Sequence, residues 1–255
     1  MTSMIPGYVL HGLAWRETSL VLEVFSREEG RLGVVARGAR RPRSALRGLL
    51  QPFQPVLLRY SAKGDLRTLL SAEWRAGLPA FRGEALLAGF YLNELVIRLL
   101  PRHDPHPSLY DAYEQALQAL STDQGGARLA LTEAVLRQFE CRLLREMGVA
   151  PDFSPSNVRD EPNALYWVSP HEGVHRAGAG VQSAEAVEVS GQTLIALSRY
   201  DQDLAAFSEG FVTSEWAGQA KRLLRGLIRH QLGGEDLASR EAVRALAQIQ
   251  RGSHD

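Results

Sequence analysis

The chain is poor in cysteine and has no long apolar run. Cys141 is its single cysteine, so no disulfide can form within the chain, which fits a reducing compartment. No apolar stretch approaches the roughly 18 residues that a membrane-spanning helix needs. The first residues show neither the basic start nor the apolar run of a secretory signal. We therefore expect a cytoplasmic protein that does not contact a membrane.

Sequence patterns of common enzymes are also missing. The chain has no GxxxxGK[ST] phosphate loop and no GxSxG nucleophile motif. Acidic pairs such as Glu28–Glu29 and Asp160–Glu161 stand in turn-like surroundings, which is typical of solvated turns rather than of paired catalytic carboxylates. We predict that the protein is not an enzyme, with no catalytic residue and no cofactor.

Charge is balanced in total but not along the chain. Basic and acidic residues number 29 each. Residues 1–78 carry twelve basic against six acidic residues, whereas residues 151–193 carry two against six. Lys63 and Lys221 are the only lysines, so richness in arginine says little by itself. The basic amino-terminal third nevertheless indicates a polyanionic partner.

Four arginines lie within residues 37–43, directly after an apolar run. Guanidinium groups bind phosphates through paired hydrogen bonds and stack on bases. The alternative is a solvated connector in which the arginines only aid solubility. We predict nucleic-acid binding without sequence specificity, and the residues expected to contribute here are Arg31, Arg37, Arg40, Arg41, Arg43 and Arg47.

Five short apolar or alternating runs precede residue 79, which is typical of strands. Pro42 and Pro52 exclude a central strand between the third and fourth runs, and Ser44 is a candidate cap for a short helix over 44–50. Five strands with this helical insert predict an OB-fold barrel, with an SH3-like barrel as the nearest alternative. The runs are 8–15, 20–25, 32–36, 55–60 and 66–74.

Four aromatic residues stand on these runs, and an OB-fold can use exposed rings to stack bases. Large aromatic residues are more often buried, so we expect most of the four in the barrel core and one or two exposed. The four are Trp15, Phe25, Tyr60 and Trp74.

Helical periodicity begins after Pro79. Residues 150–192 lose it, and only 165–169 and 186–190 are strand-like there. The sequence therefore predicts an α+β protein with an OB-fold at 1–78, a helical bundle at 79–149 and 193–250, and an irregular insertion at 150–192. The expected helices are 81–100, 108–120, 127–148, 193–200, 214–233 and 239–249.

The expected helix 214–233 carries a second basic patch. Arg222, Arg225 and Arg229 are spaced as i, i+3 and i+7, with Lys221 alongside. This spacing fits a second DNA-binding surface and an ordinary solvated helix face equally well.

The insertion offers little metal-binding chemistry. His171 and His175 are four residues apart, but Pro170 and Gly173 oppose a helix there, and HEGVH is too short for an HExxH zinc motif. We predict a polar loop at this place and no metal site, and we expect Cys141 to be a small core residue.

Several motifs follow one another in a recognisable order. ETSLV, GRL, ARGARRPRS and LQPF occupy 17–53, and FYLNELVIRLLP and LRQFECRLLREMGVAP follow within the helical part. Together they resemble the RecO family of bacterial DNA-repair and recombination mediators, over most of the chain. The resemblance implies an OB-fold, a helical bundle and an insertion similar to a zinc ribbon.

The same resemblance implies a function. It implies binding of single- and double-stranded DNA, annealing of complementary strands, and cooperation with RecR and single-stranded-DNA-binding protein in loading RecA recombinase, in association with the bacterial nucleoid. Two other classes stay open from the residues alone. One is a protein-interaction or transcription-control module built on the same barrel, and the other is a hydrolase or nuclease.

The insertion departs from the family pattern. Many members carry two C-x-x-C pairs there, roughly where this chain has Ser156, Arg159, Arg176 and Ala179. Zinc at a structural site needs four such ligands, so we expect an insertion without zinc. Packing of several apolar residues against the helical bundle is expected to hold it instead, and the candidates are Phe153, Leu165, Tyr166, Trp167 and Val168.

Overall fold

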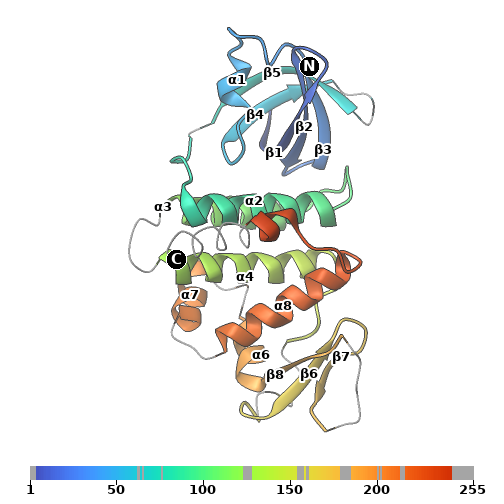
Figure 1. Ribbon diagram of the computed structural model, residues 1–255, viewed down its shortest axis with the longest axis vertical. Helices are drawn as coiled ribbons and strands as arrows, with labels where there is room; N and C mark the ends of the chain where they lie inside the picture. Colours follow the sequence, from blue (N-terminus) through green and yellow to red (C-terminus); the bar gives the residue numbers. More distant parts are fainter. Residues whose placement is uncertain are drawn as a thin grey trace, which may run out of the picture. The chain divides into compact units, whose positions relative to one another are not determined.

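A computed structural model shows two compact units (Figure 1). One unit comprises Met1–Thr122 and Leu237–Asp255, and the other comprises Asp123–Asp236. The sequence predicted three parts, at 1–78, at 79–149 with 193–250, and at 150–192. Their boundaries differ from those of the two units, and the three-part division stays a prediction. The structure describes residues 4–61, 64, 66–75, 77–122, 128–153, 158, 161–178, 185–199, 201, 203–212 and 216–242.

The first unit begins with a closed five-stranded barrel, in the order β1-β2-β3-β5-β4. Its neighbouring strands are antiparallel except for the parallel pair β3–β5, and α1 lies between β3 and β4 in sequence. This is the OB-fold, so that prediction is confirmed. The elements are β1 (Ile5–Trp15), β2 (Ser19–Ser26), β3 (Gly30–Ala36), α1 (Leu46–Leu49), β4 (Pro55–Tyr60) and β5 (Leu66–Trp74).

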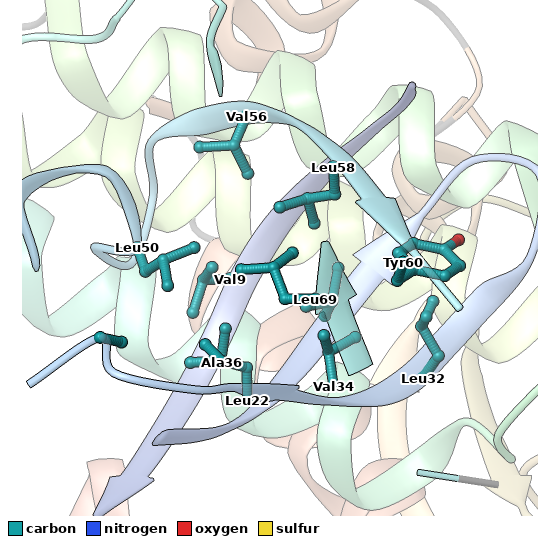
Figure 2. Packing of buried hydrophobic residues seen from close by; sticks show 12 residues of the cluster. Val9, Leu22, Leu32, Val34, Ala36, Leu50, Val56, Leu58, Tyr60 and Leu69 are labelled. Carbon is teal, nitrogen blue, oxygen red and sulfur yellow. The ribbon is translucent and has the colours of Figure 1, made fainter. Parts of the chain in front are cut away.

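Alternation along the strands fills the barrel with aliphatic side chains (Figure 2). On β2, Leu22 and Val24 are fully buried, while Glu23 between them is not. The short helix α1 begins later than expected, and the proposal that Ser44 caps it is wrong. Ser44 lies inside consecutive turns, because its N–H donates to Arg41 O and its carbonyl accepts from the N–H of Arg47.

An irregularity in β1 connects the barrel to two helices, α2 (Gly83–Leu99) and α3 (Pro107–Thr122). Val9 pairs with β2 and so does His11, but Leu10 between them is skipped by that ladder. The carbonyl oxygen of Leu10 instead accepts a 2.7 Å hydrogen bond from the Asn93 side chain on α2. Asn93 in turn accepts from the hydroxyl of Tyr113 on α3. These buried bonds satisfy the Leu10 carbonyl group, which the irregularity in β1 removes from the sheet.

Aromatic rings reinforce this connection. Tyr8 and Phe25 of the barrel contact Tyr110 and Tyr113 of α3, with ring centroids 5.3–5.8 Å apart. The Tyr8 hydroxyl donates to Glu114, 2.9 Å away. Burial raises the pKa of Tyr8, Tyr110 and Tyr113 well above the ordinary tyrosine value.

The chain returns to the first unit near its end. The Glu94 carboxylate on α2 accepts hydrogen bonds from the backbone N–H groups of Ala238 and Ser239, at 2.8 and 2.9 Å. Residues 238–242 are helical, so this carboxylate meets the positive end of their first turn. Arg240 donates to the Tyr91 hydroxyl at 2.8 Å and lies over the Tyr91 ring.

The second unit joins helices to a small sheet. Helix α4 packs against α7 and α8. Gly148 follows its end, and its φ of +72° suits the left-handed position after a helix. Helix α7 was not predicted from the sequence. The elements are α4 (Arg128–Glu146), β6 (Leu165–Ser169), β7 (Gly173–Arg176), β8 (Val187–Ser190), α6 (Gly191–Leu197), α7 (Leu204–Val212) and α8 (Ala217–Gln231).

The polar loop expected around HEGVH is wrong, because Gly173–Arg176 is strand β7. A hairpin turn joins it to β6, with Gly173 at a φ of +78°, and the sheet has the order β7-β6-β8. Phe153, Tyr166 and Val168 are buried as expected, whereas Leu165 is exposed and Trp167 is half-buried. β8 packs on α8, where Val187 lies against Gly226.

Candidate nucleic-acid interface

The arginine-rich connector between β3 and α1 is fastened to the tip of the β1–β2 hairpin. The N–H of Arg40 donates to Thr18 O at 2.8 Å. Its guanidinium group reaches the carbonyl oxygens of Arg16 and Glu17, both at 3.4 Å. The hairpin tip and the connector therefore form one continuous surface at the same end of the barrel.

A buried residue anchors the connector while its arginines stay in solvent. Ala39 is fully buried in the barrel core, and Gly38 before it has a φ of +70°. A turn closed by the N–H of Arg41 on Gly38 O follows directly. With the backbone held in this way, the exposed side chains are Arg37, Arg40, Arg41, Arg43 and Arg47.

Acidic residues are absent from a long stretch around this connector. No Asp or Glu occurs from Gly30 to Gly64. Arg16 adds a further cation at the hairpin tip, where its φ is +52°. Sequence reasoning missed Arg16, although the segment WRETS between two alternating runs marks a tight hairpin there. Glu17 at the hairpin tip is also exposed, but the arginines outnumber it, and the surface has a net positive charge suited to phosphate groups.

Exposed apolar side chains lie beside these cations. Trp15 is 47% exposed and Leu13 is 59% exposed, both on the end of β1 that leads into the hairpin tip. The Arg16 guanidinium lies 5.9 Å from the centre of the Trp15 ring. A flat exposed ring within a basic surface is what single-stranded nucleic acid uses for base stacking.

The structure divides the four candidate aromatics evenly. Trp15 and Trp74 are exposed, which agrees with the expectation of one or two exposed rings. The expectation that most of the four lie in the barrel core is wrong, because only Tyr60 does so and the buried Phe25 packs against α3. Trp74 pairs with Val56, and Val56 pairs with Gly7 at the other end of β1. Eight residues of strand separate Gly7 from Trp15, about 25 Å. Trp15 is therefore the aromatic that accompanies the connector.

Arg31 lies apart from the other arginines of its group. It stands at the opposite end of β3, about 20 Å from Arg37 along the strand. Its side chain is 15% exposed, and it forms 3.0 Å contacts with both the Glu23 carboxylate and Leu100 O. Glu23 also pairs with Arg102. These bonds give Arg31 a place in the packing of the barrel against its helices rather than in the basic surface.

The second basic patch lies on α8 in the second unit. Arg222, Arg225 and Arg229 are exposed, in the register that the spacing predicts. Lys221 differs, because its ammonium group pairs with Glu133 on α4. The Nε of Arg229 donates to Gly234 O at 3.1 Å, beyond the end of the helix. The three arginines therefore form an exposed basic surface, but Lys221 and Arg229 already have partners within the protein.

Cys141 and the expected cysteine positions of the insertion offer little chemistry. Cys141 is buried, as expected, and burial raises the pKa of its thiol far above the ordinary value, which disfavours a thiolate nucleophile. The donor set of the family's zinc ribbon does not fit this chain. Arg176, at one of the expected cysteine positions, forms a 2.8 Å ion pair with Glu161 instead. Ser156, Arg159 and Ala179 lie outside the described residues.

Among the described residues, no helix is long and apolar enough to cross a membrane.

Comparison with known proteins agrees with this architecture. The family model described as "Recombination protein O N terminal" matches residues 1–78, and that described as "Recombination protein O C terminal" matches residues 80–241. The chain is 45% identical over 250 residues to the DNA repair protein RecO of Azoarcus sp. (strain BH72), covering 95% of this chain and 96% of that protein. It is 44% identical over 248 residues to the DNA repair protein RecO of Thiobacillus denitrificans, covering 95% and 92%.

The fold and these matches define a recombination protein, in which an amino-terminal OB-fold precedes a second family region that begins at residue 80. The chain belongs to the RecO family.

Proposed function

We propose that the protein is a DNA-repair and recombination mediator without catalytic activity, which binds single- and double-stranded DNA irrespective of sequence. The observation that carries this proposal is the connector surface, formed by exposed arginines next to exposed Trp15. Guanidinium groups contact phosphates, which are the same for every sequence, and the indole ring stacks on any base.

The proposal predicts a steep salt dependence of DNA binding. Each phosphate contact adds about −0.9 to the slope of log K against log salt for duplex DNA, and about −0.7 for single strands. Replacing Arg40, Arg41 and Arg43 together by Ala should weaken binding to all sequences alike and reduce the size of the slope by about two to three. Fluorescence anisotropy with labelled oligonucleotides over a salt series measures both quantities.

A control variant with the same loss of charge makes this test specific. Arg27→Ala, Arg75→Ala and Arg102→Ala remove three arginines that pair with Asp111, Glu114 and Glu23. They lie where the barrel meets α3 and its preceding loop, far from the connector, so this variant should retain most of its affinity. Equal losses in both triple variants would mean that net charge alone matters. Unchanged binding in the connector variant would move the interface elsewhere, with α8 as the first candidate.

Annealing and partner binding rest on family membership rather than on a particular contact. We propose that the protein anneals complementary strands and, with RecR and single-stranded-DNA-binding protein, helps to load RecA recombinase in the cytoplasm. An annealing assay with complementary strands coated by single-stranded-DNA-binding protein tests the first step. Sequence-specific duplex binding would favour a transcription-control module instead, and metal-dependent DNA cleavage would favour a nuclease.

A further inference from the structure

Three potential metal ligands from separate segments meet in the second unit. His171 lies in the turn between β6 and β7, Glu185 precedes β8, and His230 lies in the last turn of α8. Their ligand atoms all lie within 4.8 Å of one another. Nδ1 of His230 is 2.9 Å from the Glu185 carboxylate, and the rings of His171 and His230 meet edge to face with centroids 4.6 Å apart.

Each of these residues lies within or next to regular structure. β6 pairs with both β7 and β8, and β8 packs on α8, so the sheet brings its hairpin turn and its last strand to the helix. The buried Ser169 hydroxyl accepts from the N–H groups of His171 and Glu172, at 3.3 and 3.4 Å, which shapes the turn. The cluster is therefore a product of the fold and not of one flexible loop.

We propose that His171, Glu185 and His230 form a binding site for a divalent transition-metal ion such as zinc. Two imidazoles and one carboxylate are a known three-ligand set for zinc, in which water completes the coordination. Tetrahedral coordination with bonds of about 2.0–2.1 Å separates neighbouring ligand atoms by about 3.3 Å. The Glu185 side chain is 54% exposed and His171 is also exposed, so small rotations can bring the atoms to that spacing.

This site is separate from the place where many family members hold zinc. Those cysteine positions lie before β6 and from the last residue of β7 onward, and Arg176, which is that last residue, pairs with Tyr166 in the hairpin. His171 lies beyond the opposite end, where Ser169 pairs with Gly173. Three residues along each strand separate the two places, about 10 Å.

The expectation of an insertion without metal considered only donors between residues 150 and 192. His230 lies 59 positions after His171 and outside that segment, so sequence reasoning did not count it. A bound ion would tie the hairpin turn and the start of β8 to the end of α8. Because an unfolded chain cannot present this set together, binding would stabilise the folded unit.

Zinc titration of the full-length protein tests the proposal. Isothermal titration calorimetry should show one zinc ion per chain, and zinc should raise the Tm. Loss of an outer-shell partner already weakens metal sites by about 10–100-fold, so His171→Ala and Glu185→Gln should each weaken binding by at least about tenfold. Both side chains are exposed, and the Tm without zinc should stay close to that of the unaltered protein.

His175→Ala is the matched control. His175 lies on the same hairpin, but its ring contacts Glu172 O at 2.6 Å and it is not part of the cluster. This variant should bind zinc like the unaltered protein. Equal zinc binding in all of these proteins would place the ion on other residues and overturn the proposal. Absence of binding in the unaltered protein would overturn it too, leaving only the 2.9 Å contact between His230 and Glu185.

Discussion

Gly30 opens β3 at a backbone conformation that side-chain-bearing residues rarely adopt. Its φ is +68°, and a Cβ placed there would lie 1.9 Å from Asp104 O. The loop from α2 to α3 can approach the barrel this closely only because the position carries no side chain. One missing methyl group thus determines how the barrel and that loop fit together.

Gly30→Ala should therefore destabilise the first unit. Backbone strain of this kind costs about 1–3 kcal/mol, and displacement of Asp104 adds to it. The matched control is Gly48→Ala, because Gly48 is exposed on α1 with no atom near its missing Cβ. That change should be neutral or stabilising by up to about 1 kcal/mol. Urea unfolding compares the two, and equal midpoints would contradict the role given to Gly30.

At the scale of residues, the sequence predicted exposure and burial better than it predicted the role of individual side chains. The exposure of the five arginines between positions 37 and 47 and the burial of Cys141 followed from pattern and residue type. Arg31 was grouped with its neighbours in sequence, yet the five strand residues that follow it, 32–36, place it at the other end of the barrel. Linear spacing cannot distinguish the two ends of one strand. The ion pair with Glu23 also depends on the β2–β3 register, which pairs Arg31 with Phe25.

Among the elements, the β1–β2 hairpin contributes the exposed apolar part of the proposed interface. It carries Leu13, Trp15 and Arg16, and its backbone carbonyls receive Arg40 of the connector. Neither the hairpin nor the connector would form this surface alone. The exposed ring belongs to the hairpin, and most of the charge belongs to the connector.

Trp15→Ala should weaken binding to single strands more than binding to duplex DNA. Stacking on an aromatic ring is worth about 1–3 kcal/mol per base, or about 5–150-fold, and bases within a duplex are not free to stack on it. Trp74→Ala is the control, since Trp74 is similarly exposed but lies at the other end of β1. Anisotropy with single-stranded and duplex oligonucleotides separates the effects. Equal losses for both variants would argue against a stacking role of Trp15.

Elements with a strong apolar periodicity could be predicted from the sequence, whereas a short element of mostly polar residues could not. All five barrel strands, β6 and the long helices lie close to their expected bounds. Strand β7 was missed because GVHR has one apolar residue, and its pairing with β6 supplies the structure that its composition lacks. The Asn93 side chain on α2 has no signal in the sequence, because its partner is a carbonyl group released by an irregularity in β1.

Stability of the whole first unit should depend on pH in the alkaline range. Burial raises the pKa of Tyr8, Tyr110 and Tyr113 above the ordinary value of 10.0. A group with a raised pKa in the folded state contributes stability that is complete below its unfolded pKa, and that contribution falls as pH rises toward the folded value. The unit should therefore lose stability above about pH 10, with tyrosine ionisation and unfolding occurring together.

Tyr110→Phe tests this with little other change. The Tyr110 hydroxyl is buried and has no hydrogen-bond partner among the residues that the structure describes. Its removal should leave stability at neutral pH unchanged or higher and should make the alkaline loss shallower. Tyrosinate absorbance and circular dichroism followed together over a pH series give the comparison. Ionisation of all three tyrosines before any unfolding would contradict their burial.

The return of the chain to α2 has a consequence for the order of events during synthesis. All strands of the barrel are complete by Trp74, so the barrel can close while later residues are still being translated. Glu94 must wait for Ala238, 144 residues further on. At about 5–20 residues per second, that interval is about 7–30 s on the ribosome. The barrel is thus complete well before helix α2 receives Ala238 as a partner.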